Sequence, residues 1–112
     1  MEISVKDIEQ VTVVSITGSV DGLTAEGLLS ALGEQVKSGR THLVGDFTGV
    51  EYTSSAGLRA LLATTKEVRQ RGGDFRLAAV RTEVHRVLEL SGFTSILKMY
   101  GDVDSAVASY GH

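Results

Sequence analysis

The sequence contains no cysteine among its 112 residues. Disulfide bonds, thiol catalysis and cysteine-based metal sites are therefore excluded, and the composition fits a reducing compartment. No apolar run approaches the roughly 20 residues that a membrane-spanning helix requires, and no charged-then-apolar leader opens the chain. We therefore expect a cytoplasmic protein with no direct membrane insertion.

Aromatic residues and positive charge are also scarce. Tryptophan is absent, with three Phe and three Tyr present, so we expect a core built mainly from Leu, Val, Ile and Ala. The net charge of −3 argues against nucleic acid as a partner, because phosphate binding needs a basic patch. A length of 112 residues predicts a single domain, residues 1–112.

Hydrophobic periodicity predicts strands and helices that alternate after an initial hairpin. Strands are expected at residues 3–17 (two, joined by a turn at Glu9-Gln10), near Leu43, at 75–79 and within 93–100. Helices are expected at 24–38, 55–71, 82–92 and from 102 onwards. This order predicts an α/β fold with a mixed sheet of four to five strands, an N-terminal hairpin and about four helices.

Local signals refine these helices. Asp21 and Thr24 are alternative caps of the first, whose buried stripe is expected to be Leu28, Leu29, Leu32 and Val36. Thr82 and Asp102 are expected to cap the last two. Two loops, residues 18–23 and 48–55, leave strands and enter helices, so we expect them to meet at the carboxyl edge of the sheet.

The stretch from Asp46 to Gly73 organises the chain. A short strand runs into a loop that ends in Ser54 and Ser55, and a helical pattern follows. Two hydroxyl groups thus lie at a helix N-terminus, where they can cap backbone N–H groups or accept a phosphate that the helix tolerates. Near the other end of this helix, basic residues are expected to form a solvated face: Lys66, Arg69 and Arg71.

Catalytic and metal-binding patterns are not found. His42, His85 and His112 have no partners at nucleophile or metal spacing, and we expect His85 at the surface. The G-x-S-x-G elbow and the G-x-x-x-x-G-K-S/T phosphate loop are both missing. Asp46 and Glu51 lack a neighbouring third ligand. We therefore expect neither enzymatic activity nor a cofactor.

Residues 46–62 read D-F-T-G-V-E-Y-T-S-S-A-G-L-R-A-L-L, which resembles the central signature of STAS domains, the sulfate-transporter and anti-sigma-factor-antagonist fold. Two further segments agree in order and spacing. Gly18-Ser19-Val20-Asp21 is similar to the family's G-E-L-D segment, and Leu90-Ser91-Gly92-Phe93 is similar to its L-S-G-L/F helix end. The resemblance covers essentially the whole chain and favours the free-standing anti-sigma-antagonist branch.

This resemblance implies a phosphoprotein that acts by partner switching in transcription regulation and stress response. The unphosphorylated form would bind an anti-sigma factor that is also a serine kinase and so release a sigma factor. A serine phosphatase would reverse the phosphorylation. On the family pattern D-S-S/T-G-L the acceptor is Ser55, with Ser54 as runner-up. The implied partner-binding residues are Asp21, Thr53, Ser54, Ser55, Ala56, Gly57 and Arg59.

Three positions depart from the family pattern. Ser54 replaces the aspartate before the acceptor, Ala56 replaces a second hydroxyl residue, and Arg59 replaces a frequent glycine. The lost aspartate keeps an alternative open: a non-catalytic STAS subunit of a stress-signalling scaffold, or an accessory subunit of a membrane transporter. In that case Ser54 and Ser55 would be ordinary helix caps.

Overall fold

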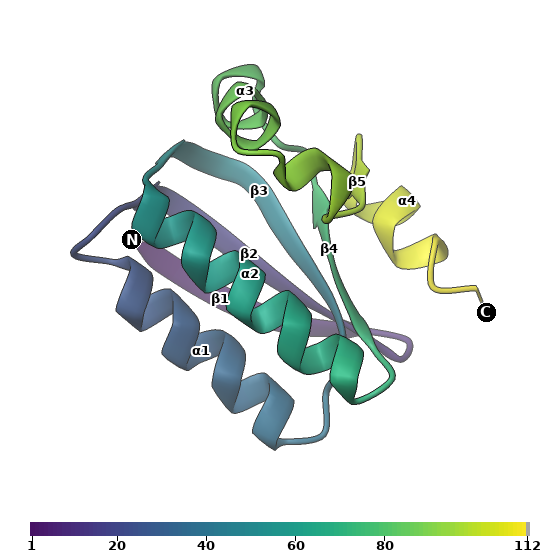
Figure 1. Cartoon of the computed structure of the whole chain (residues 1–112). Helices are drawn as coiled ribbons and strands as arrows, with labels where there is room; N and C mark the ends of the chain where they lie inside the picture. The colour runs from purple at the N-terminus through teal and green to yellow at the C-terminus, as the bar shows by residue number, and fades with distance from the viewer. Residues whose placement is uncertain (112) are drawn as a thin grey trace.

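Five strands form one mixed sheet in the order β1-β2-β3-β4-β5 in the computed structural model, which describes residues 1–111 (Figure 1). His112 lies outside the described residues. The strands are β1 (Glu2–Ile8), β2 (Val11–Val20), β3 (His42–Thr53), β4 (Asp74–Ala78) and β5 (Met99–Tyr100). Strands β1 and β2 form an antiparallel hairpin, whereas β2 to β5 pair in parallel. The predicted mixed sheet with an N-terminal hairpin is confirmed.

Helices cover both faces of the sheet. They are α1 (Ala25–Lys37), α2 (Ser55–Gln70), α3 (Thr82–Leu90) and α4 (Val103–Ala108), with a short 3-10 helix, η1, at Phe93–Ser95. Helices α1 and α2 lie side by side across one face (Figure 1). Helix α4 packs against β3, β4 and β5 near the C-terminus. No helix within residues 1–111 is both long and apolar enough to cross a bilayer.

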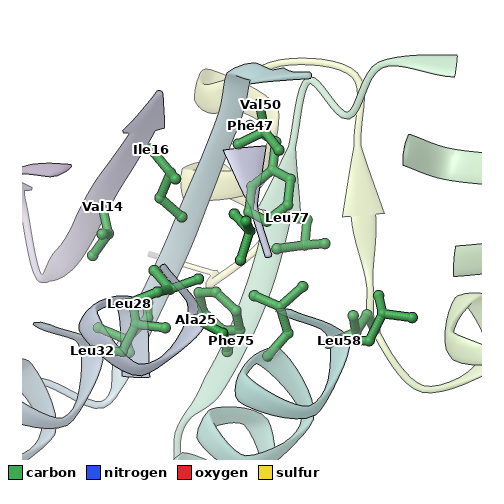
Figure 2. Packing of buried hydrophobic residues seen from close by; sticks show 14 of the residues in the cluster. Val14, Ile16, Ala25, Leu28, Leu32, Phe47, Val50, Leu58, Phe75 and Leu77 are labelled. Carbon is green, nitrogen blue, oxygen red and sulfur yellow. The ribbon is translucent and has the colours of Figure 1, made fainter. Parts of the chain in front are cut away.

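The core is divided by the alternation of side chains along the strands. On β2, Val14 and Ile16 join the cluster under α1 and α2, whereas Val11 and Val13 join a smaller cluster under α4. Figure 2 shows the larger cluster, in which Phe47 and Phe75 are fully buried. This core is mainly aliphatic, as the composition predicts.

The two central strands are longer than predicted. Residues 18–20 and 48–53 were expected in loops, but β2 continues to Val20 and β3 to Thr53. Two register shifts, between Ser15 and Thr17 and between Gly18 and Ser19, keep the strands paired as far as the Val20–Thr53 match. Gly18 has φ 109, so this glycine serves a bulge and does not end the strand.

Two of three predicted helix details are wrong, and the third is confirmed. Leu29 was expected in the buried stripe of α1 but is 41% exposed, whereas the other three residues of that stripe, Leu28, Leu32 and Val36, are buried as predicted. Thr82 does not cap α3: it is the first helical residue, and the preceding residue, Arg81, makes no side-chain cap. Asp102 does cap α4, since its carboxylate accepts a hydrogen bond from the Ser105 N–H at 2.7 Å.

Candidate functional site

The two serines occupy different positions at the start of α2. Ser54 is the extended N-cap residue, and its hydroxyl accepts a hydrogen bond from the Gly57 N–H at 3.4 Å. Its backbone N–H donates to the Val20 carbonyl at 2.8 Å. Ser55 is the first helical residue and is exposed, and no described residue hydrogen-bonds its hydroxyl. Ser54 therefore has a capping role, whereas the Ser55 hydroxyl is accessible.

Gly57 and Thr53 support this turn from inside the protein. Thr53 is 2% exposed and Gly57 is buried. A Cβ atom on Gly57 would collide with Thr53 Oγ1 and would lie 2.8 Å from Val20 Cγ1 and 3.0 Å from the Val20 carbonyl oxygen. The first turn of α2 can therefore approach the end of β2 this closely only without a side chain at position 57.

Asp21 organises the turn between β2 and α1. Its Oδ1 accepts hydrogen bonds from the backbone N–H groups of Leu23, at 2.9 Å, and Thr24, at 3.1 Å. The Thr24 hydroxyl donates to the Ser19 carbonyl at 2.8 Å and accepts from the Asp21 N–H at 2.9 Å. Of the two predicted caps, Thr24 occupies the N-cap position of α1 without a side-chain cap bond. The carboxylate that accepts the backbone N–H groups of this turn belongs to Asp21.

The Asp21 carboxylate is charged at neutral pH. The hydrogen bond from Leu23 N–H is the main cause that lowers the pKa of Asp21, and the Thr24 bonds and the nearby N-terminal ammonium act in the same direction. No described residue donates a hydrogen bond to Oδ2. The turn thus presents a carboxylate with one oxygen available to a partner.

Leu23 lies in this region but was not among the partner-binding residues that the sequence predicted. Its side chain is 93% exposed, although the turn that carries it is held by the hydrogen bonds of Asp21. A large apolar residue placed between Asp21-Gly22 and Thr24 was the available signal in the sequence. Burying this side chain against a partner would remove apolar surface from water without first ordering a flexible loop.

Arg59 and Ala56 lie on the outer part of the first turns of α2. Ala56 is half-buried against the core, and Arg59 is exposed. Both line a recess of about 310 Å³ between α1 and α2; its lining is Ala25, Glu26, Leu29, Ala56, Arg59, Ala60 and Ala63. No residue within 1–111 forms an ion pair or hydrogen bond with the Arg59 side chain.

The histidine and serine residues within 1–111 are not brought together as a catalytic set. His42 begins β3, where it stacks on Tyr110, whereas Ser55 follows the other end of that strand. Asp46 accepts hydrogen bonds from the N–H and hydroxyl of Thr48. In the part of the chain that the structure describes, no group of three or more His, Asp or Glu is placed to hold a metal.

A separate charged cluster surrounds Asp74 at the start of β4. Its carboxylate accepts from Arg69 Nε at 2.8 Å and from Arg76 Nε at 3.0 Å, and Lys98 Nζ lies 3.9 Å away. Arg69 also donates to the Ile96 carbonyl at 2.7 Å. Arg69 is exposed, as a solvated face predicts, but its guanidinium is also held by Asp74 and by the Ile96 carbonyl, contacts that the helix pattern did not predict.

The comparisons with known proteins identify the family. The STAS domain model matches residues 2–106. BtrV of Bordetella bronchiseptica, provisionally named an anti-sigma factor antagonist, is 33% identical over 110 residues, which are 98% of this chain and 95% of BtrV. RsfB of Mycobacterium tuberculosis, an anti-sigma-F factor antagonist, is 32% identical over 105 residues, or 94% of this chain and 85% of RsfB.

Structural similarity agrees with the sequence comparisons. The crystal structure of an anti-sigma factor antagonist from Mycobacterium paratuberculosis matches with a TM-score of 0.87 and 31% identity, over 96% of this chain and 92% of that one. The fold and the sequence thus point to one assignment. The chain belongs to the STAS-domain family of anti-sigma factor antagonists.

Proposed function

We propose that this chain binds an anti-sigma factor in its unphosphorylated form and that phosphorylation of Ser55 ends the binding. Family membership supports the binding role. The single observation that supports Ser55 as the switch is its exposed hydroxyl at the first position of α2, to which no described residue hydrogen-bonds. Ser54 is less suited as an acceptor, because its hydroxyl is the N-cap of the helix.

The phosphorylation requires a kinase, which we propose is the anti-sigma factor itself. The Ser55 oxygen attacks the γ-phosphorus of ATP, a new O–P bond forms, the bond to the β-phosphate oxygen breaks, and the hydroxyl proton is released as ADP leaves. A serine phosphatase restores the hydroxyl by hydrolysis. This chain serves as substrate and binding partner, and it requires no cofactor.

The free energy of a phosphate at this position differs between the free protein and a complex, so phosphorylation would break the complex but not the fold. A negative charge at a helix N-terminus is stabilising by about 0.3–1 kcal/mol. In an interface the same phosphate must lose water, and an unpaired buried charge costs several kcal/mol. Because about 1.4 kcal/mol corresponds to a tenfold change in affinity, the complex is lost while the fold remains.

The proposed partner surface is formed by residues that reach the outside at this edge of the sheet. Asp21, Leu23, Ser55, Ala56 and Arg59 are the candidates for direct contact. The other three predicted residues, Thr53, Ser54 and Gly57, take a supporting role, because the first and last are buried and Ser54 caps α2. In this proposal Thr53 and Gly57 act from inside the protein, in place of the direct contact that the resemblance implies.

A comparison of three tagged versions expressed in the protein's own cells tests this proposal: the parent chain, Ser55→Ala and Ser55→Asp. We expect the parent and Ser55→Ala to retain an anti-sigma factor with a kinase domain, identified by mass spectrometry, and Ser55→Asp to lose it. Matching thermal unfolding curves are the control for folding. Equal retention by the two variants contradicts the switch, and a scaffold or transporter subunit in its place contradicts the sigma-factor role.

A further inference from the structure

Arg59, four residues after the proposed acceptor, is a cation with no counter-ion among residues 1–111. It is exposed, and within residues 1–111 no hydrogen bond or ion pair holds its guanidinium. Arg81 differs from it, because its Nε donates to the Thr48 carbonyl at 3.0 Å. Arg59 is therefore available for a new anionic partner, whereas Arg81 is already hydrogen-bonded.

The helix places Arg59 beside Ser55. Residues at positions i and i+4 of an α-helix are neighbours on its surface, with Cβ atoms about 5–6 Å apart. Side chains tilt towards the helix N-terminus, so a long side chain at position 59 extends over the turn that contains Ser55. The first turn of α2 has no acidic residue that would compete for the guanidinium.

We propose that Arg59 binds the phosphate of phosphorylated Ser55, so that phosphorylation also withdraws a cation from the partner surface. This inference rests on the proposed function, because it assumes that Ser55 is the acceptor. In the unmodified chain Arg59 faces solvent and can pair with a partner's carboxylate. In the phosphorylated chain the guanidinium pairs with phosphate oxygens, which it matches well in geometry. One modification then changes two features of the surface.

Two neighbouring carboxylates oppose this pairing only weakly. Glu26 on α1 lines the same recess as Arg59 but forms no ion pair with it. Asp21 accepts two backbone N–H groups of its own turn. A phosphate carries close to two negative charges, more than either carboxylate, and lies on the same helix face as Arg59. The phosphate is therefore the preferred partner of the guanidinium.

A phosphorus NMR titration tests the pairing directly. Phosphoserine is incorporated genetically at position 55 of the full chain, in the parent, Arg59→Gln, Arg59→Lys and Lys66→Gln. The second pKa of the phosphate is measured in each. An adjacent cation favours the dianion, so we expect this pKa to be about 0.3 unit higher in Arg59→Gln than in the parent, with Arg59→Lys closer to the parent.

Lys66→Gln is the matched control, because it also removes one exposed positive charge from α2 but lies eleven residues beyond Ser55. It should leave the pKa of the phosphate unchanged. Equal values in the parent and Arg59→Gln, or equal shifts in Arg59→Gln and Lys66→Gln, overturn the proposal. Because the phosphate is installed without a kinase, the titration gives its answer even where Ser55 is not the natural acceptor. Failure of the proposed function would appear separately, as unchanged partner binding by the phosphorylated parent.

Discussion

The backbone N–H of Ser54 donates a hydrogen bond to the carbonyl of Val20 at 2.8 Å. This bond joins the N-cap of α2 to the end of β2, one residue beyond the last paired residues of β2 and β3, Val20 and Thr53. Asp21 follows directly, so the turn before α1 and the first turn of α2 are built on the same pair of strands. The proposed partner surface therefore has a rigid base.

Gly57→Ala should destabilise the protein. A Cβ atom would lie 2.8 Å from Val20 Cγ1 and 3.0 Å from the Val20 carbonyl oxygen, so α2 must move away from β2. We expect the free energy of unfolding to fall by about 1–2 kcal/mol in urea titration. Gly33→Ala in α1 is the matched control: a Cβ atom there would meet nothing within 4 Å, so this change should stabilise by about 0.5–1 kcal/mol. A neutral or stabilising Gly57→Ala would contradict the close approach.

Single alanine substitutions should separate the roles of the two serines. Ser54→Ala removes the N-cap, and we expect a loss of about 0.5–1 kcal/mol, because the capping bond is long at 3.4 Å. Ser55→Ala removes a hydroxyl that no described residue bonds, and its effect should stay within about 0.5 kcal/mol. Chemical denaturation of both variants decides the matter. A larger cost for Ser55→Ala would mean that Ser55 is a structural residue.

The sequence was sufficient to predict the order of strands and helices and the start of α2 at Ser54 and Ser55, because hydrophobic periodicity and helix signals are local. It did not predict the true ends of β2 and β3. Gly18 resembles a loop glycine in sequence, yet it forms a bulge that depends on the neighbouring strand. Bulged pairing between distant residues has no local signature.

Burial at the site was equally hard to predict. Thr53 and Gly57 belong to the motif, but which motif residues face outward depends on how closely α2 approaches Val20. Leu29 fits the helical stripe of α1, yet it is exposed. The side chains of α2 that face it, among them Ala60 and Ala63, are small and leave an open recess between the two helices. These outcomes follow from packing between elements.

Leu23→Ser should weaken partner binding without loss of stability. The side chain is 93% exposed in the free protein, so its removal costs the fold little, whereas its burial in a complex is worth about 1.5–3 kcal/mol. We expect at least a tenfold loss of affinity in titration calorimetry with the anti-sigma factor. Leu90→Ser, at 84% exposure on α3, is the control and should bind like the parent. Equal losses in both variants would show that Leu23 is not a specific contact.

Asp74→Asn should destabilise the protein at neutral pH and change its acid sensitivity. Burial acts to raise the pKa of Asp74, but hydrogen bonds from Arg76, Arg69 and the Phe75 N–H outweigh it, so the net pKa is lowered. The stabilisation is therefore present above the unfolded-state pKa, about 4, and is lost as pH falls through the folded-state pKa. At pH 7 we expect a loss of about 2–3 kcal/mol for the variant.

Urea unfolding from pH 7 to pH 2.5 measures this effect. The difference in unfolding free energy between the parent and Asp74→Asn should narrow below about pH 4, because the parent then loses the charge that the variant lacks. Glu89→Gln, which removes an exposed carboxylate beside His85, is the control and should change little. A difference between the parent and Asp74→Asn that stays constant with pH would show that the Asp74 ion pairs do not stabilise the fold.

The most direct test of the central claim is phosphopeptide mapping of the protein isolated from its own cells, grown with and without stress. The proposed switch predicts partial phosphorylation of Ser55 that changes between the two conditions, because the Ser55 hydroxyl is exposed and no residue within 1–111 hydrogen-bonds it. Phosphate on Ser54 instead would keep a switch but place it on the capping residue. Absence of phosphate from both serines under every condition would contradict the account.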